Sequence, residues 1–399
     1  MDKKKKIYNI LLISCLIIFL EPQGFKEDFY KILMSIDNIY KALKLICFCL
    51  IAYIYGYKLI KKQIKISNFF IIAFLFEFTS FVATLVNKGA LTRFCGPALT
   101  VIAMIMLAEI IISENKMQWI LKNANIYFRI CFFINLFTII LVDGFNVLPS
   151  QKIYFLGIDN RWIFTYLPWI TFEFLLSVYD KNNKKKAITY FILSELTLLF
   201  KFSVSAMLAS MLWIFIIFEK ENIYYSKYAP VSFLTIIITN LLFVFVKIQK
   251  IFNGFLVKIL HKDWTLSGRT YLWDKIIKDT SIRPFLGNGT QSIQYDKNYF
   301  SESYNNKLNF LAVVHGHNSF MTVLYRSGII GLILYFTMWL APLIMLFKSK
   351  NNNFANKLFI SIIIALILSI FDTIDCSGLY FILLCAFNIE KLNSNINKE

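Results

Sequence analysis

The sequence predicts an all-α polytopic membrane protein of about twelve transmembrane helices, with one large extracytoplasmic loop that carries short helices. First, 58% of the 399 residues are hydrophobic, which is more than a soluble globular domain carries. Second, apolar stretches with almost no charge recur along the chain, and most are long enough to cross a bilayer. Third, the lysines gather in the polar breaks between these stretches, as they do in cytoplasmic loops.

The apolar stretches lie at about residues 7–20, 41–59, 67–86, 95–113, 126–143, 162–179, 187–201, 204–218, 229–247, 328–347, 357–373 and 376–389. The first follows "MDKKKK" and resembles a signal peptide. However, "EPQGFKEDF" comes next, without a small-residue cleavage site, so we expect this stretch to remain as the first span.

Positive charge predicts the orientation of the spans. With the N-terminus inside, the inner loops hold most of the lysines, for example Lys184, Lys185 and Lys186, and the short outer loops hold few. This bias predicts an even number of spans in the cell (inner or cytoplasmic) membrane, with both termini cytoplasmic. The chain then divides into spans one to nine (1–247), a large outer loop (248–317), spans ten to twelve (318–390) and a cytoplasmic tail (391–399).

The net charge of +18 does not indicate a nucleic-acid-binding protein. The basic residues sit in loops between spans, where they face anionic lipid headgroups. No basic patch interleaved with aromatic residues occurs on a soluble unit. We therefore expect the lipid bilayer to be the partner of these charges, and no nucleic acid.

The loop at 248–317 is rich in aromatic and aliphatic residues, so we expect a small helical subdomain there rather than disorder. Its stretch 268–279 predicts an amphipathic helix with Trp273 and Ile276 on one face. Arg269 lies in the first turn, where a helix is already positive. A cation beside free N–H groups favours a phosphate or diphosphate ligand. An exposed arginine without a ligand is the simpler alternative.

The turn "HGHNS" leads from the loop into span ten. We expect Asn318 or Ser319 to cap that helix. His317 then lies just outside the membrane, where a neutral imidazole can accept a proton near pH 7. A histidine that only hydrogen-bonds at the interface is the alternative. Upstream, "RPFLGNG" predicts a turn in which Gly287 and Gly289 adopt positive φ.

Three motifs in order, "LSGRTYLW", "PFLGNG" and "HNSFMTVLYRSGIIGLILY", resemble the C-terminal signature of the O-antigen ligase and polymerase family, the Wzy- and WaaL-type membrane glycosyltransferases. The pattern runs SGR, W, P-x-x-G-x-G, HN and then G-x-x-G in an apolar helix, over about residues 265–340. The late outer loop extends the resemblance less specifically over most of the chain. Within the family, the chain is most similar to the Wzy polymerases of polysaccharide repeat units.

The resemblance implies an enzyme that takes a glycan from undecaprenyl diphosphate at the outer leaflet and moves it to a hydroxyl of an acceptor sugar. It carries diphosphate binding onto Arg269. It carries onto His317 the role of general base, or of orienting the leaving group. A departing diphosphate needs cations and an incoming hydroxyl needs a base, so these residue types fit. A capsular polysaccharide or O-antigen chain is the implied product, with a flippase and a chain-length regulator as partners.

No nucleotide, metal ion or other cofactor is expected from the resemblance. The sequence agrees on the metal ion, because it contains no DxD motif. Its three histidines are accompanied by no carboxylate cluster in the sequence, which makes a poor metal site.

One feature of the family is missing. Many members carry an arginine after a serine at the outer start of the eighth span, whereas Val204 takes that place in "LLFKFSVSAMLAS". Lys201, about one turn earlier, or Arg161 in "LGIDNRWIFTY" can supply the second cation for the diphosphate. Lysine lacks the bidentate fork of arginine. Either residue can equally be an interfacial cation that reaches toward water.

Two other functions stay open. The motifs do not separate the polymerase from a ligase that moves a finished glycan to a terminal acceptor. A twelve-span flippase or transporter fits the number of spans, but the long outer loop and the lack of repeat symmetry argue against it. Charges inside spans are costly, and we expect Glu109 and Arg129 to form an ion pair between spans four and five.

Overall fold

The protein is an all-α bundle, which confirms the predicted fold class. The computed structural model describes residues 3–26, 31–148, 151–201, 203–219, 224–260, 264–266, 268–302, 315–349, 353–374 and 376–396. The long helices are α1 (Lys3–Phe19), α2 (Lys31–Ile60), α3 (Asn68–Val86), α4 (Leu91–Ser113), α5 (Met117–Ile140), α6 (Ile163–Tyr179), α7 (Asn182–Phe200), α10 (Ala229–Leu241), α14 (Ser319–Lys348) and α15 (Asn353–Phe371). The shorter ones are α8 (Val204–Ser210), α9 (Ile214–Ile217), α11 (Asn253–Leu260), α12 (Arg269–Thr280), α13 (Ile293–Glu302), α16 (Ser377–Phe387) and α17 (Ile389–Ile396). Strands β1 (Phe145–Leu148) and β2 (Gln151–Ile153) form one antiparallel hairpin.

Each of the twelve apolar stretches in the sequence coincides with a helix or a pair of helices. In the described part of the chain, seven helices are long and apolar enough to cross a membrane, and two shorter apolar helices cover Val204–Ile217 and Ser377–Phe387. The remaining three are α1 and α6, with 17 residues each, and α7, which contains several lysines. The chain is therefore a multi-pass membrane protein.

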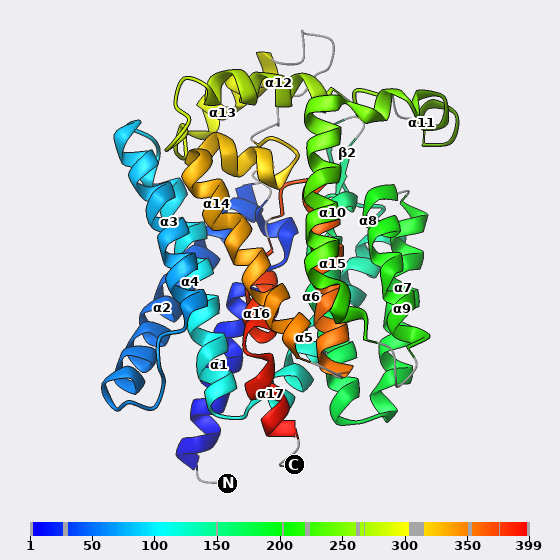
Figure 1. Ribbon diagram of the computed structural model, residues 1–399. Coiled ribbons are helices and arrows are strands. Elements are labelled where there is room, and N and C mark those ends of the chain that lie inside the picture. Colours follow the sequence, from blue (N-terminus) through cyan, green and yellow to red (C-terminus); the bar gives the residue numbers. More distant parts are fainter. Residues whose placement is uncertain are drawn as a thin grey trace.

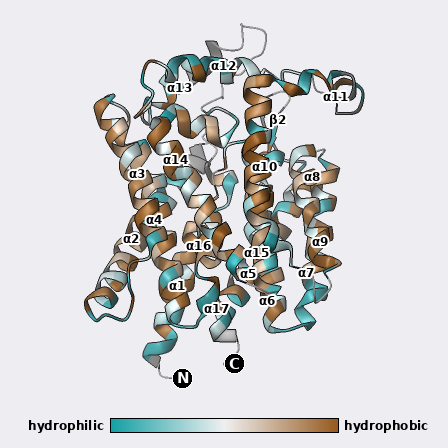
Figure 2. Cartoon of the chain, viewed as in Figure 1, coloured by the Kyte–Doolittle hydropathy of each residue, from teal (hydrophilic) through white to brown (hydrophobic). Residues whose placement is uncertain are grey.

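The two ends of the bundle differ in what they carry. Figure 1 places both chain termini and α17 at one end, and α11, α12 and α13 of the large loop at the other end. Hydrophobic residues dominate the length of the bundle between them, and hydrophilic residues gather toward the two ends (Figure 2). Termini on one side fit an even number of crossings, and their cytoplasmic orientation stays a prediction.

The centre of the bundle consists of α6, α15 and α16. Nearly all residues of these three helices are buried, including the polar ones. A helix that is apolar on every side has no face for lipid and belongs in the interior. By contrast, α2 and α3 expose many large apolar side chains, as helices that face lipid do.

The helix α14 is broken at Gly328, where φ is 61° and ψ is −162°. The turn at 284–289 of the outer loop is hydrogen-bonded into this break. It takes over carbonyls and amides that would otherwise bond within the helix. The four bonds are Asn288 N to Tyr325 O (2.8 Å), Gly289 N to Arg326 O (2.8 Å), Ile329 N to Pro284 O (2.8 Å) and Ile330 N to Phe285 O (3.3 Å).

Glycine is required at this junction for two reasons. Gly287 and Gly289 have φ of +67° and +69°, which confirms the predicted turn. A Cβ on Gly287 would also lie 2.6 Å from the backbone nitrogen of Gly328, and one on Gly289 would lie 2.5 Å from Cα of Thr84 in α3. The P-x-x-G-x-G motif thus fixes the outer loop to α3 and α14.

The predicted ion pair between Glu109 and Arg129 is wrong. Arg129 instead donates two hydrogen bonds of 2.8 Å to the carboxylate of Glu173 in α6. Glu109 accepts a hydrogen bond from the hydroxyl of Tyr55 in α2. The reason is packing, because α5 lies mainly against α6 and α4 lies against α2. Spans four and five are adjacent in the sequence, but Glu109 and Arg129 face different helices.

Candidate active site

The helix α12 carries Arg269 at its first position and anchors it to the bundle. Leu272, Trp273 and Ile276 on one face of α12 have no exposed surface, as the amphipathic pattern predicted. Gly268 precedes the helix with a φ of 86°, a conformation that glycine adopts without strain. Arg269 is thereby held at the end of the bundle where α14 begins and α15 ends.

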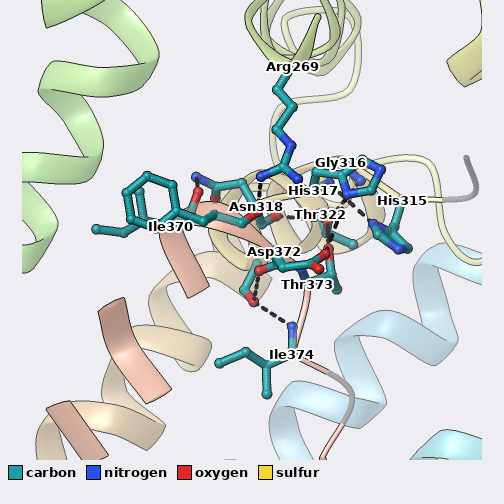
Figure 3. Close-up of polar contacts among 12 residues, drawn as sticks. Arg269, His315, Gly316, His317, Asn318, Thr322, Ile370, Asp372, Thr373 and Ile374 are labelled. Carbon is teal, nitrogen blue, oxygen red and sulfur yellow. Dashed lines mark hydrogen bonds and ion pairs between the residues drawn. The ribbon is translucent and has the colours of Figure 1, made fainter. Parts of the chain in front are cut away.

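Arg269 reaches from α12 to the end of a membrane helix. Its Nη1 donates a hydrogen bond to the backbone carbonyl of Phe371, the last residue of α15. The carbonyls at a helix C-terminus lack partners within the helix and carry partial negative charge, so a guanidinium is favourable there. A guanidinium has five N–H donors, so this bond leaves others for a ligand. Figure 3 shows Arg269 pointing down onto the turn that follows α15.

The same helix α12 positions the histidine turn. Trp273 Nε1 donates to the carbonyl of Gly316 at 2.9 Å, and Gly316 N donates to Thr322 Oγ1 at 3.1 Å. His317 has a φ of 45°, which is uncommon for a residue other than glycine. The turn therefore presents the imidazole of His317 in a conformation that its neighbours fix.

Asn318 connects three elements beneath His317. Its Oδ1 accepts from Met321 N at 3.0 Å and so caps α14, which confirms one of the two predicted caps. Its Nδ2 donates to Asn240 Oδ1 in α10 at 2.6 Å and to the carbonyl of Ile370 in α15 at 3.0 Å. Asn318 is fully buried, so its partners lock α10, α14 and α15 together below the imidazole.

The turn after α15 brings Asp372 to the histidines. Ser319 Oγ donates to the carbonyl of Asp372 at 3.1 Å and accepts from Ile374 N at 3.0 Å. Thr373 N donates to Asp372 Oδ1 at 2.8 Å. The turn is thus tied to the start of α14 on both sides of the carboxylate (Figure 3).

Asp372 Oδ1 lies 3.4 Å from His317 Nδ1, an ion-pair distance that is long for a hydrogen bond. Burial disfavours the ionised carboxyl group, but contact with His317 and, to a smaller extent, the guanidinium of Arg269 outweigh it and hold the pKa of Asp372 below its ordinary value. A carboxylate beside Nδ1 favours the tautomer with the proton on Nδ1. Nε2 of His317 then carries the lone pair.

His315 lies against His317, with ring centroids 4.5 Å apart, and its Nδ1 accepts from His317 N at 3.3 Å. Burial is the main cause that holds the pKa of the His315 imidazole well below its ordinary value, and His317 adds to it. Asp372 opposes this shift, whereas Arg161 and Arg326 contribute as nearby cations. His315 is therefore neutral at neutral pH.

The two candidates for the second cation lie in different places. Arg161, in the short helix Asp159–Arg161 after the hairpin, is close enough to His315 to lower its pKa. Lys201 lies 3.8 Å from Asp143 Oδ1 and 5.0 Å from the ring centroid of Tyr154. In the described residues, the structure thus brings Arg161 toward the histidines and places Lys201 in a separate ion pair.

Two residues of the site were not identified in the sequence. Asp372 lies in "FDTID", an acidic break between spans eleven and twelve. The predicted eleventh span, 357–373, includes Asp372 at its end, so the sequence did not single this residue out. Arg326 lies in "LYRSG", within one of the quoted motifs, and acts on both His315 and Asp296. Arg326 lies two residues before the break in α14 at Gly328, a break that the sequence indicates only by a glycine.

The prediction of a poor metal site rested on the absence of a DxD motif and on histidines without a carboxylate cluster in the sequence. In the structure, Asp372 supplies a carboxylate beside the histidines from a distant turn. One atom from each of His315, His317 and Asp372 lies within 4.8 Å of the other two, a set that could hold a metal ion.

Comparison with known proteins agrees with the motifs. Residues 189–336 match the family model described as Wzy_C, O-Antigen ligase, a region that contains Arg269 and His317. The chain is 40% identical over 77 residues to the exopolysaccharide production protein ExoQ of Rhizobium meliloti, which is 18% of this chain and 17% of that protein. It is 27% identical over 194 residues to a putative polysaccharide ligase of Rickettsia felis, which is 47% of this chain and 45% of that protein.

The chain therefore spans less than half the length of these relatives. The match to the family model covers the large loop and the helices beside it rather than the whole chain. Together they support the O-antigen ligase and polymerase family for this protein, without separating its ligases from its polymerases.

Proposed function

We propose that this protein transfers a glycan from undecaprenyl diphosphate to a hydroxyl of an acceptor sugar at the outer face of the membrane, and that it polymerises lipid-linked repeat units. The observation that carries the proposal is the convergence of Arg269 and His317 on one turn, Phe371–Asp372, at the outer end of the bundle. A cation and a base side by side suit the displacement of a diphosphate by a hydroxyl.

The reaction needs one proton transfer and one leaving group. Nε2 of His317 accepts the proton of the acceptor hydroxyl. The oxygen of that hydroxyl bonds to the anomeric carbon of the donor glycan. The bond from that carbon to the phosphate oxygen breaks, and lipid diphosphate leaves with the electron pair. Asp372 beside Nδ1 stabilises the imidazolium that forms.

The guanidinium groups of Arg269 and Arg161 are the proposed diphosphate ligands. Arg269 has donors beyond its bond to Phe371, and two parallel N–H groups fit phosphate oxygens. Arg161 acts electrostatically on His315. Lys201 remains a weaker proposal, because its ammonium lies with Asp143 and Tyr154. A flippase and a chain-length regulator are the proposed protein partners.

Ligation of a finished glycan is the second candidate function. It is favoured by the description of the matched family as O-antigen ligase and by the resemblance to a putative polysaccharide ligase. Both reactions use the same donor chemistry and differ in the acceptor. The site residues argued above serve either one.

Purified full-length protein, supplied with a lipid-diphosphate-linked oligosaccharide, tests the proposal. A ladder of lengthening lipid-linked chains is expected from a polymerase, and a single transfer to a separate acceptor is expected from a ligase. His317→Ala and Arg269→Ala should each abolish transfer while the protein remains in the membrane. Normal transfer by both variants would disprove this site.

A further inference from the structure

His315, His317 and Asp372 form a group that could hold one cation. One ring nitrogen of each histidine and one carboxylate oxygen lie within 4.8 Å of one another. The distance of 3.4 Å between His317 Nδ1 and Asp372 Oδ1 is long for a hydrogen bond. It equals the separation of about 3.4 Å expected for two ligands on a tetrahedral zinc ion with bonds of about 2.0–2.1 Å.

The donor types select the kind of cation. Two imidazoles and one carboxylate suit zinc and neighbouring transition metals, whereas Mg²⁺ and Ca²⁺ prefer oxygen ligands. Three protein ligands leave a zinc coordination position open to solvent or an anion.

The surroundings set a limit on the affinity. Arg269 lies close enough to Asp372 to lower its pKa, and Arg161 and Arg326 do the same to His315. These cations oppose a divalent metal ion, and the carboxylate of Asp372 offsets only part of their charge. We therefore expect binding that a chelator reverses, unlike that of a structural zinc site.

We propose that His315, His317 and Asp372 bind a transition-metal cation of the zinc class, and that the bound cation stops glycan transfer. A metal ion on Nδ1 of a neutral imidazole leaves the ring proton on Nε2. His317 then cannot accept the proton of the acceptor hydroxyl. The inhibition rests on the proposed function, whereas the metal site itself rests on the geometry alone.

The test uses full-length protein in detergent micelles or nanodiscs. Titration with Co²⁺ followed by its absorption spectrum measures binding without an activity assay, and Zn²⁺ should displace the Co²⁺ signal. Zn²⁺ should also inhibit transfer, and a chelator should restore it. Mg²⁺ at the same concentration should neither displace the Co²⁺ signal nor inhibit transfer.

The deciding variant is His315→Asn. The asparagine Oδ1 can replace Nδ1 as acceptor for His317 N and so keep the turn, and Zn²⁺ inhibition is measured relative to the variant's own basal transfer. Zn²⁺ inhibition and Co²⁺ affinity should fall by about tenfold or more, since even outer-shell changes cost about 10–100-fold in metal affinity. Substitution of the third histidine in the chain, His261→Asn, is the matched control and should respond to metal as the unchanged protein does.

The outcomes separate the two proposals. No Co²⁺ signal from the unchanged protein, equal Zn²⁺ inhibition of His315→Asn, or activation by Zn²⁺ would overturn the metal proposal. A Co²⁺ signal that His315→Asn loses, in a protein without any glycan transfer, would support the metal site and overturn the proposed function. If His315→Asn does not fold, loss of the Co²⁺ signal in Asp372→Asn decides the binding.

Discussion

The carboxylate of Asp372 lies 3.4 Å from Nδ1 of His317, and the carbonyl of the preceding residue, Phe371, accepts a hydrogen bond from Arg269. One turn at the end of α15 thus meets both residues that the sequence motifs single out. Because the turn is bonded to Ser319 and Thr322 of α14, the relative position of the imidazole and the guanidinium is set by the membrane helices.

Arg269→Lys tests the geometry of the guanidinium. Lysine keeps the charge but cannot bond Phe371 and a phosphate in the same forked arrangement. Loss of one hydrogen bond to a charged group, about 1.5–3 kcal/mol, predicts a decrease in kcat/KM of about 10–100-fold. Steady-state kinetics with the lipid-linked donor measure it. Lys278→Ala, an exposed change on the same helix α12, should leave kcat/KM unaltered, and an equal loss there would point to helix damage instead.

Asp372→Asn tests the role of the carboxylate beside His317. The variant removes the charge that stabilises the imidazolium, so kcat should fall by about 10²–10⁴-fold, the range of general acid–base catalysis. KM should change less, because the donor binds through the arginines. Asp274→Asn removes an exposed carboxylate paired with Lys247 and should have normal kcat. A loss expressed only in KM would show that Asp372 does not act through His317.

The sequence predicted the helices, and singled out two candidate site residues, for identifiable reasons. Membrane helices are encoded by continuous apolar stretches, so the twelve stretches and the twelve helical segments coincide. Arg269 and His317 lie in motifs next to their own structural signals, an amphipathic helix and an Asn318 cap. These signals are local, and the structure reproduces them.

The remaining site residues depend on contacts between distant segments. Asp372 joins His317 only because α15 ends beside the start of α14, and no local pattern encodes that contact. The failed pairing of Glu109 with Arg129 has the same cause, since a span carries no signal for which neighbour its charge faces. Arg326 is similar, because its carbonyl accepts from Gly289 N in the distant turn at 284–289.

The pair of Arg129 and Glu173 predicts a stability effect. The side chain of Glu173 has no exposed surface, so Arg129→Met leaves a buried carboxylate without its partner. Such a break costs about 3–5 kcal/mol, whereas replacement of both partners by apolar residues is often neutral. Thermal unfolding in detergent should therefore show a large loss for Arg129→Met and recovery in Arg129→Met with Glu173→Leu. A double variant as unstable as the single one would contradict this account.

Cysteine labelling tests the predicted orientation. In a background with the seven native cysteines replaced, Lys278→Cys in α12 should react with a membrane-impermeant maleimide on intact cells. Lys185→Cys, in the lysine-rich break before span seven, should react only after the cells are opened. The reverse pattern would place Arg269 and His317 on the cytoplasmic side, where a donor on the outer leaflet cannot reach them.

Gly328→Ala tests whether the break in α14 holds the outer loop. The φ of +61° strains any residue with a Cβ, and the added atom would lie 2.3 Å from the carbonyl oxygen of Phe285. The strain alone costs about 1–3 kcal/mol. The clash adds to this cost, because the backbone of α14 or of the turn at Phe285 must move. We expect a clearly lower unfolding temperature, together with loss of transfer, since the loop that carries Arg269 is bonded into this break.

Gly96→Ala is the control, because a Cβ there meets no atom within 4 Å and alanine favours the helix by about 0.5–1 kcal/mol. If Gly328→Ala unfolds at the same temperature as Gly96→Ala, then α14 runs through this position without a break.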